Sequence, residues 1–173
     1  MSDASSRPTQ QSLRMERRYT GIEVQDLWDL WTTKEGFESW WGPEGFRVRV
    51  HKLEPRVGGE LHYDMIAVGE REIAYMKQAN MAPSHHTRAT FISFRPLQQL
   101  ELVHVIDFIP GLAAYDNHMS VEFRQEPAGA AMIITIEPHP QPEWTRQTGR
   151  GMESQLTKVP GALALRHPQD RSG

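Results

Sequence analysis

The sequence predicts an α+β domain in which a curved antiparallel sheet is wrapped round one long C-terminal helix. Three observations support this. Segments with an apolar period of two dominate the middle of the chain, two short helical patterns follow the first strand, and residues 142–159 repeat apolar side chains every three to four positions. An antiparallel sheet with polar residues on one face has one apolar face to cover, and only the last helix is long enough to cover it.

The N-terminal part predicts one strand, at residues 12–20, followed by two short helices. Two S/T-x-x-E sequences, Thr20 to Glu23 and Thr32 to Glu35, match the capping box that satisfies free amides in a helix's first turn. After the first box, one apolar stripe is formed by Val24, Leu27, Trp28 and Trp31.

The second short helix carries two adjacent tryptophans and ends at Gly42 and Pro43. Trp40 continues the face of Phe37 at i+3, so we expect it to pack inward. Trp41 lies about 100° further round the helix and is free to line a pocket mouth or face a partner. The pair is therefore not expected to act as one site, and Gly42-Pro43 is expected to turn the chain into the sheet.

The rest of the chain predicts six strands and one helix. Residues 69–87 fit no clean period, and we expect an irregular strand and a long loop there. The predicted strands are 46–54, 60–65, 88–94, 100–108, 117–126 and 130–138. On the final helix, one face is formed by Trp144, Thr148, Met152, Leu156 and Val159.

Composition limits the class of protein. The chain has 173 residues, enough for one sizeable core, and a formal net charge of −3, which provides no basic field for nucleic acid. Because cysteine is absent, disulfides, thiolate catalysis and Cys-based metal sites are excluded, and a reducing compartment is favoured. We expect a cytoplasmic protein with no nucleic-acid or membrane partner, and a homodimer is compatible with the sequence.

The ends of the chain are polar. Residues 1–11 have no apolar core of a signal peptide and are interpreted as a disordered lead-in, and 166–173 as a disordered tail. Residues 12–165 are expected to form a single domain. No apolar run approaches the roughly 20 residues of a membrane-spanning helix.

Several motifs resemble one superfamily. The segment "WWGPEGF" (40–46) and the "PxxGGxxxYxM" pattern formed by Pro55, Gly58, Gly59, Tyr63 and Met65, together with the helix "RGMESQLTKV", are similar to the SRPBCC or START-like superfamily. Within it they resemble the group named for the activator of heat-shock protein 90 ATPase, over residues 13–165. The resemblance implies a helix-grip fold with a hydrophobic pocket between sheet and C-terminal helix. Tryptophan is common near Met152 in such sequences, so methionine there could enlarge or reshape the pocket.

The alternation of the strands predicts the pocket wall. The ligand-binding candidates share inward positions on strands or on the pocket face of a helix: Trp41, Leu61, Tyr63, Met65, Ile92, Phe94, Leu102, His104, Ile106, Phe108, Met119, Val121, Trp144, Met152 and Leu156. Further inward positions are Phe123, Met132, Ile134, Ile136, Thr148 and Gln155. Nearly all are apolar, which favours a hydrophobic ligand.

His104 and Tyr63 are the candidate catalytic or anchoring groups, since an imidazole titrates near neutral pH and a phenol can donate a hydrogen bond. The alternative is that His104 is a buried histidine bonded to a neighbour such as Tyr63, because buried polar groups are usually satisfied rather than catalytic. A wrong strand phase would also remove His104 from the pocket.

We predict no metal site and no cofactor. His85 and His86 are adjacent, so their side chains point apart on an extended chain, and both are interpreted as loop residues, as is His139. The carboxylates of Asp64 and Asp107 are isolated on different strands. The sequence contains no nucleophile elbow, phosphate loop or dinucleotide fingerprint.

Three hypotheses follow. The first is a protein that binds a small hydrophobic molecule, lipid-like or polyketide-like, in the cavity. The second is an enzyme of the polyketide cyclase, aromatase or dehydratase type that uses His104 and Tyr63 as acid–base groups. The third, suggested by the group's name, is a co-chaperone-like activator of the heat-shock protein 90 ATPase.

Overall fold

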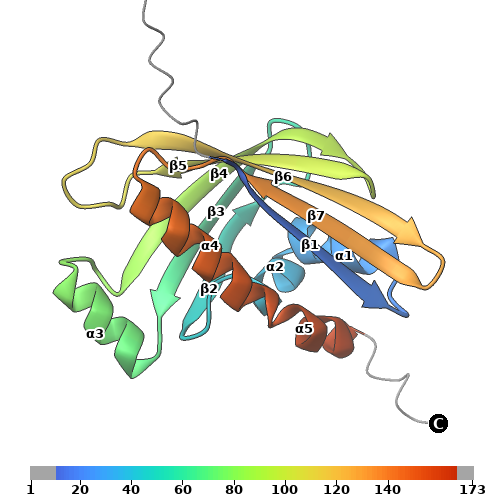
Figure 1. Ribbon diagram of the computed structural model, residues 1–173, viewed down its shortest axis with the longest axis horizontal. Coiled ribbons are helices and arrows are strands. Elements are labelled where there is room, and N and C mark those ends of the chain that lie inside the picture. The colour runs from blue at the N-terminus through green and yellow to red at the C-terminus, as the bar shows by residue number, and fades with distance from the viewer. Residues whose placement is uncertain (1–10, 167–173) are drawn as a thin grey trace, which may run out of the picture.

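The computed structural model describes residues 11–166, and the predictions for residues 1–10 and 167–173 lie outside this range. Seven antiparallel strands form one curled sheet in the order β1-β7-β6-β5-β4-β3-β2, and the long helix near the C-terminus crosses its concave side (Figure 1). The strands are β1 (Leu13–Thr20), β2 (Phe46–Leu53), β3 (Glu60–Ala67), β4 (Ser84–Arg95), β5 (Gln99–Ile106), β6 (Tyr115–Glu126) and β7 (Gly129–Ile136). The predicted fold class is confirmed.

Two short helices, α1 (Val24–Thr32) and α2 (Lys34–Trp40), follow β1 as predicted, but their caps lie elsewhere. Glu23 caps α1 in a box with Asp26, because Thr20 is still part of β1. Thr33, one residue after the predicted cap, accepts a hydrogen bond from the Gly36 amide. The boundary signals therefore located both helices but missed each cap by one to three residues.

The two helices bring most of the tryptophans into the core. Trp28 packs edge-on against Phe94 and Phe123 at ring-centroid distances of 4.9 and 5.2 Å. Trp31 contacts both Trp40 and Trp41, at 5.0 and 5.3 Å. Edge-to-face pairs of this kind add to the free energy gained by burying large apolar surfaces. The aromatic cluster fixes α1 and α2 on the sheet.

Helix α3 (Glu70–Gln78) is a correction to the sequence analysis, which expected no helix in residues 69–87. Met76 is the one buried residue of this helix. Its apolar residues, 73–76, are consecutive, and a short apolar run of this kind does not distinguish a helix from a strand. The strand that follows, β4, begins at Ser84, so His85 and His86 lie on a strand and not in a loop.

The C-terminal helical region is broken into α4 (Pro142–Leu156) and α5 (Val159–Arg166). Arg166, expected in the tail, is the last residue of α5 and forms ion pairs with Asp26 and Asp29 of α1. No helix among residues 11–166 is both long and apolar enough to cross a membrane.

Three side chains of the C-terminal helical region form hydrogen bonds with the backbone of the loop after α2. The Gly42 amide donates to Gln155 Oε1 and the Glu44 amide to Ser154 Oγ, both over 2.9 Å. Lys158 Nζ donates to the Gly42 carbonyl at 2.7 Å. Gly42 has φ +93°, in the left-handed region that favours glycine, so the chain turns there as expected.

Strand β4 contains a bulge that the period-two pattern did not reveal. The pairing with β5 shifts between Phe91 and Ser93, so Phe91 is fully buried while Ile92 is 44% exposed. Phe94, after the bulge, again packs against the core. An extra residue in one strand reverses the facing of its side chains, and the expectation that Ile92 faces inward was therefore wrong.

Candidate functional site

A cavity with two chambers lies between the sheet and α4. The outer chamber has a volume of about 490 Å³ and is bordered by α3, and the inner chamber of about 180 Å³ lies between the sheet and α4. Six residues line both: Pro43, Met65, His85, Phe108, Trp144 and Thr148. The chambers are therefore neighbouring parts of one site.

The structure brings nine of the fifteen predicted wall residues to this cavity. They are Trp41, Tyr63, Met65, His104, Ile106, Phe108, Met119, Trp144 and Met152. Thr148, Gln155 and Ile136, also expected to face inward, line the inner chamber as well.

The other six predicted wall residues are placed elsewhere. Ile92 is on the outer side of the bulge, and Phe94 packs against Trp28. The remaining four belong to the packed core: Leu61, Leu102, Val121 and Leu156. Facing inward is not sufficient to reach the cavity, because buried side chains of α1, α2 and α5 pack with the rest of the concave face in one apolar core.

Three polar side chains form a hydrogen-bonded chain in the wall of the inner chamber. The Trp41 indole Nε1–H donates to the Tyr63 hydroxyl oxygen over 3.1 Å, and that oxygen lies 3.2 Å from His104 Nε2. Because an indole can only donate, the Tyr63 oxygen is the acceptor in the first bond. The Tyr63 hydroxyl also has a hydrogen bond with the side chain of Thr87. The Trp41 and His104 rings lie nearly parallel, with centroids 6.3 Å apart.

Burial keeps this chain neutral. Desolvation, with a smaller contribution from His139, lowers the pKa of His104 to about 4. Desolvation also raises the pKa of Tyr63 far above its usual value of 10. His104 faces inward as predicted. Its hydrogen bond with Tyr63 agrees with the alternative in the sequence analysis, a buried histidine bonded to a neighbour.

His139 is buried, contrary to its interpretation as a loop residue exposed to solvent. Its Nδ1 is hydrogen-bonded to the Tyr115 hydroxyl, and its Nε2 lies 2.8 Å from Thr148 Oγ1 on α4. It lines the inner chamber and joins the end of the sheet to the helix. The partners come from distant parts of the chain, so its local Pro-rich sequence did not reveal them.

His85 is the site residue that the sequence analysis missed. Its ring stacks on Phe108 at a centroid distance of 4.4 Å and lines both chambers. Among the described residues, three buried side-chain atoms have no hydrogen-bond partner, Tyr19 Oη, Trp31 Nε1 and His85 Nδ1. Of these three residues, His85 is the one that lines the cavity, and burial lowers its pKa.

The outer chamber is open at α3, which contributes both apolar and charged side chains. Its wall contains Tyr75 and Met76 of α3 together with Met81. The charged residues Arg71 and Glu72, also from α3, line it as well. Methionine and tyrosine can adjust to ligands of different shape.

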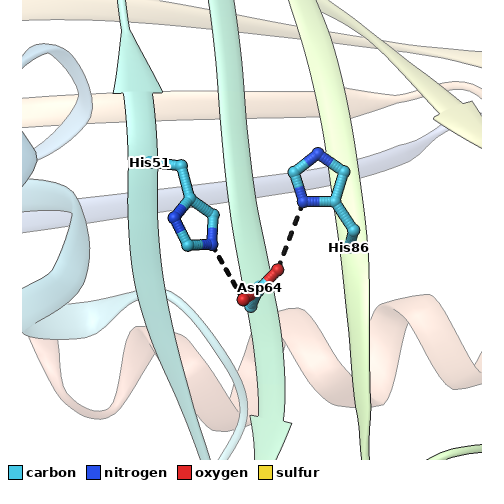
Figure 2. A group of neighbouring side chains, drawn as sticks. All are labelled: His51, Asp64 and His86. Carbon is cyan, nitrogen blue, oxygen red and sulfur yellow. Dashed lines mark hydrogen bonds and ion pairs between the residues drawn. The ribbon is translucent and has the colours of Figure 1, made fainter.

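Alternation separates His86 from His85. While His85 faces the cavity, His86 projects from the outer face of the sheet, where it meets Asp64 and His51 (Figure 2). These three side chains could hold a metal ion, and they lie on the face of the sheet opposite the cavity.

Comparisons with known proteins bear on the same region. The model of the family described as "Activator of Hsp90 ATPase homolog 1-like protein" matches residues 22–164. This range includes both chambers and all helices up to most of α5. Among curated proteins, none matches the chain.

Several solved structures have the same fold. The AHSA1 protein from Silicibacter pomeroyi matches with a TM-score of 0.68 and 21% identity, covering 90% of this chain and 99% of that one. A protein from Arthrobacter aurescens gives 0.70 and 17%, with coverage of 88% and 86%. A protein from Chromobacterium violaceum gives 0.68 and 18%, with coverage of 86% and 94%. At these identities the likeness concerns the fold alone.

Proposed function

The chain belongs to the Activator of Hsp90 ATPase homolog 1-like family, and we propose that it binds one small hydrophobic molecule in the two-chamber cavity. The observation that carries the proposal is the unpartnered His85 Nδ1, which lies where the chambers meet, together with Met65, Phe108 and Trp144. A buried polar atom without a partner costs free energy, and a ligand would supply the partner.

The shape and lining of the cavity support this class of ligand. A volume of about 490 Å³ in the outer chamber lies within the range of small-molecule pockets, and the inner chamber extends it. Apolar side chains from β3, β5, β6 and α4 surround the inner chamber, among them Met65, Ile106, Met119 and Met152. Transfer of an apolar ligand surface from water to this wall is favourable.

The polar groups limit the ligand further. Burial keeps His85 and His104 largely neutral at neutral pH, so neither supplies a full positive charge for an anionic group in the inner chamber. A neutral imidazole nitrogen pairs well with a hydroxyl or carbonyl group. We therefore propose an uncharged, largely apolar molecule with one such group near His85, as in a lipid or polyketide-like compound.

Binding can be tested with the full chain and a panel of fluorescent fatty alcohols and aromatic polyketide-like ketones. Quenching of Trp41 and Trp144, which line the cavity, reports occupancy. We expect one molecule bound per chain. Met152→Trp should fill the inner chamber and weaken binding at least tenfold, and His85→Phe should weaken compounds with a hydroxyl or carbonyl more than their hydrocarbon analogues.

Ile92→Trp is the matched control, because Ile92 lies on the outer side of the β4 bulge and touches neither chamber. It should bind as the wild type does. The proposal is wrong if native mass spectrometry finds no compound of the panel bound, or if Met152→Trp and Ile92→Trp bind alike.

An enzyme that uses the same cavity is the second candidate, because His104 and Tyr63 converge there at hydrogen-bond distance. Their pKa shifts run against it. A histidine that stays neutral down to about pH 4 and a tyrosine whose pKa is raised are both poor at exchanging protons near neutral pH. Turnover of a ketone substrate that is lost in both His104→Ala and Tyr63→Phe would favour the enzyme.

Activation of the heat-shock protein 90 ATPase is the third candidate, and the family's description is what favours it. The chaperone's ATPase rate, measured with and without a molar excess of this protein, tests it directly. An unchanged rate would remove this candidate and leave ligand binding untouched.

A further inference from the structure

We propose that His51, Asp64 and His86 bind one divalent transition-metal ion, with Zn²⁺ the best match, on the outer face of the sheet. The three side chains come from β2, β3 and β4, which are neighbours in the sheet. Figure 2 shows both imidazole rings turned toward the carboxylate that lies between them. This site is separate from the cavity and from the proposed ligand.

Strand register explains why the three donors meet. Asp64 and His86 are direct partners across β3 and β4, so their side chains project side by side on the same face. His51 reaches the same point because the β2–β3 pairing shifts between Val50 and Lys52, which leaves His51 as the extra residue of a bulge. Bulges commonly redirect a side chain in this way.

The distances are close to those of a metal site. His51 Nε2 lies 2.8 Å from Asp64 Oδ2, His86 Nδ1 lies 3.2 Å from Asp64 Oδ1, and all three ligand atoms lie within 4.8 Å of one another. With bonds of about 2.0–2.1 Å, tetrahedral Zn²⁺ holds its ligand atoms about 3.3–3.4 Å apart. To bind the ion, His51 Nε2 and His86 Nδ1 must mainly move closer to each other.

That adjustment involves side chains alone. The side chains of His51 and His86 are 42% and 50% exposed, so their rings can turn without moving the strands. The imidazole rings already lie with centroids 5.9 Å apart. Asp64 is 27% exposed and is held between them. Water can occupy the remaining coordination position from the solvent side.

The donor set determines the class of metal. Two imidazole nitrogens and one carboxylate oxygen suit Zn²⁺ and its neighbours in the first transition row, whereas Ca²⁺ and Mg²⁺ prefer all-oxygen sites.

Charged neighbours on this face are mostly paired with one another. Lys52 bonds Glu60 at 2.6 Å, and Arg88 lies 3.8 Å from Asp107. Arg49 is the register partner of Asp64 on β2, and its positive charge opposes metal binding. Exposure to water screens this repulsion.

Calorimetric titration of the full, metal-free chain with ZnCl₂ tests the proposal. We expect one Zn²⁺ per chain, and at least tenfold weaker binding in His86→Ala and in Asp64→Asn. His118→Ala is the matched control, since His118 is an exposed histidine on β6 outside this group, and it should bind as the wild type does. MgCl₂ should give no binding at the same concentration.

Absence of zinc binding, or equal binding in the wild type and in His86→Ala, would overturn the proposal, because adventitious binding does not depend on one histidine. Co²⁺ added to the ¹⁵N-labelled wild type provides a test that needs no variant. The paramagnetic broadening should centre on the amides of residues 51, 64 and 86, and broadening centred elsewhere would contradict the site.

Discussion

The hydroxyl oxygen of Tyr63 lies 3.2 Å from Nε2 of His104, which joins β3 to β5 across the intervening strand β4. The same oxygen accepts a hydrogen bond from Trp41 Nε1, so one hydroxyl group is the hydrogen-bond partner of two buried ring nitrogens. Burial keeps the phenol and the imidazole neutral. This arrangement gives the inner chamber a polar but uncharged wall.

Replacing Tyr63 by phenylalanine should lower the free energy of unfolding by about 1–3 kcal/mol, because it leaves the Trp41 and His104 nitrogens buried and unpaired. Urea denaturation followed by far-UV circular dichroism measures the change. Tyr75→Phe is the control, since Tyr75 is 51% exposed, and its change should stay within about 0.5 kcal/mol. Equal effects of the two substitutions would contradict the role assigned to the Tyr63 hydroxyl.

Stability should fall as the pH is lowered from about 6.5 toward about 4. The pKa of His104 is lowered to about 4 in the folded state, so in this range the unfolded chain binds more protons than the folded one. The neutral imidazole therefore contributes its full stabilisation above about pH 6.5 and loses it progressively below, by an amount on the order of 3 kcal/mol. The free energy of unfolding measured across this range tests it.

His85 and His139, whose pKa values are also lowered by burial, contribute in the same direction, so a variant must isolate His104. His104→Gln keeps a polar side chain that does not titrate, and its stability should depend less steeply on pH than that of the wild type. Parallel curves for the two proteins would show that His104 is not the main source.

Gly36→Ala should destabilise the protein although alanine favours helices. A Cβ atom at Gly36 in α2 would lie 2.2 Å from the Asp29 carbonyl oxygen of α1, a backbone atom that cannot move alone. We expect a loss of about 1–3 kcal/mol in the free energy of unfolding. Gly149→Ala in α4 is the counterpart, because its Cβ would meet Leu13 at an ordinary 3.7 Å, and it should stabilise by about 0.5–1 kcal/mol. Thermal melting of both variants should shift in opposite directions.

Lys158→Met should lower the free energy of unfolding by about 1.5–3 kcal/mol, since it removes a charged donor that bonds the Gly42 carbonyl at 2.7 Å and lies near the carbonyls of Pro43 and Phe46. Methionine keeps the apolar stem, so the loss reports the ammonium group. Lys77→Met, an exposed lysine of α3, is the control and should change stability little. If both variants unfold at the same urea concentration, the ammonium group does not secure the loop.

Much of the fold was predictable because its signals are local. The alternation of Leu102, His104 and Ile106 in β5 placed all three on the buried face, and the structure confirms this. Helix α3 was not predictable in the same way, since its apolar residues, 73–76, form one short consecutive run, which periodicity alone does not assign to a helix or a strand. The β4 bulge was hidden as well, because it depends on how the strand pairs with β5 and not on its own composition.

The features of the candidate site likewise differ in whether the sequence could predict them. By itself the sequence determined an α+β fold with one apolar sheet face and an inward-facing His104, since these follow from periods of 2 and 3.6 along the chain. The position of Trp41 does not follow from them, because Trp41 caps α2 in an extended conformation and its ring contacts that of Trp40. Only the tertiary structure decided that His85 lines the cavity without a partner, that His139 is buried, and that His86 meets His51 and Asp64. The physical reason is that strand register and helix docking, which bring distant residues within bonding distance, are set by the packing of the whole domain.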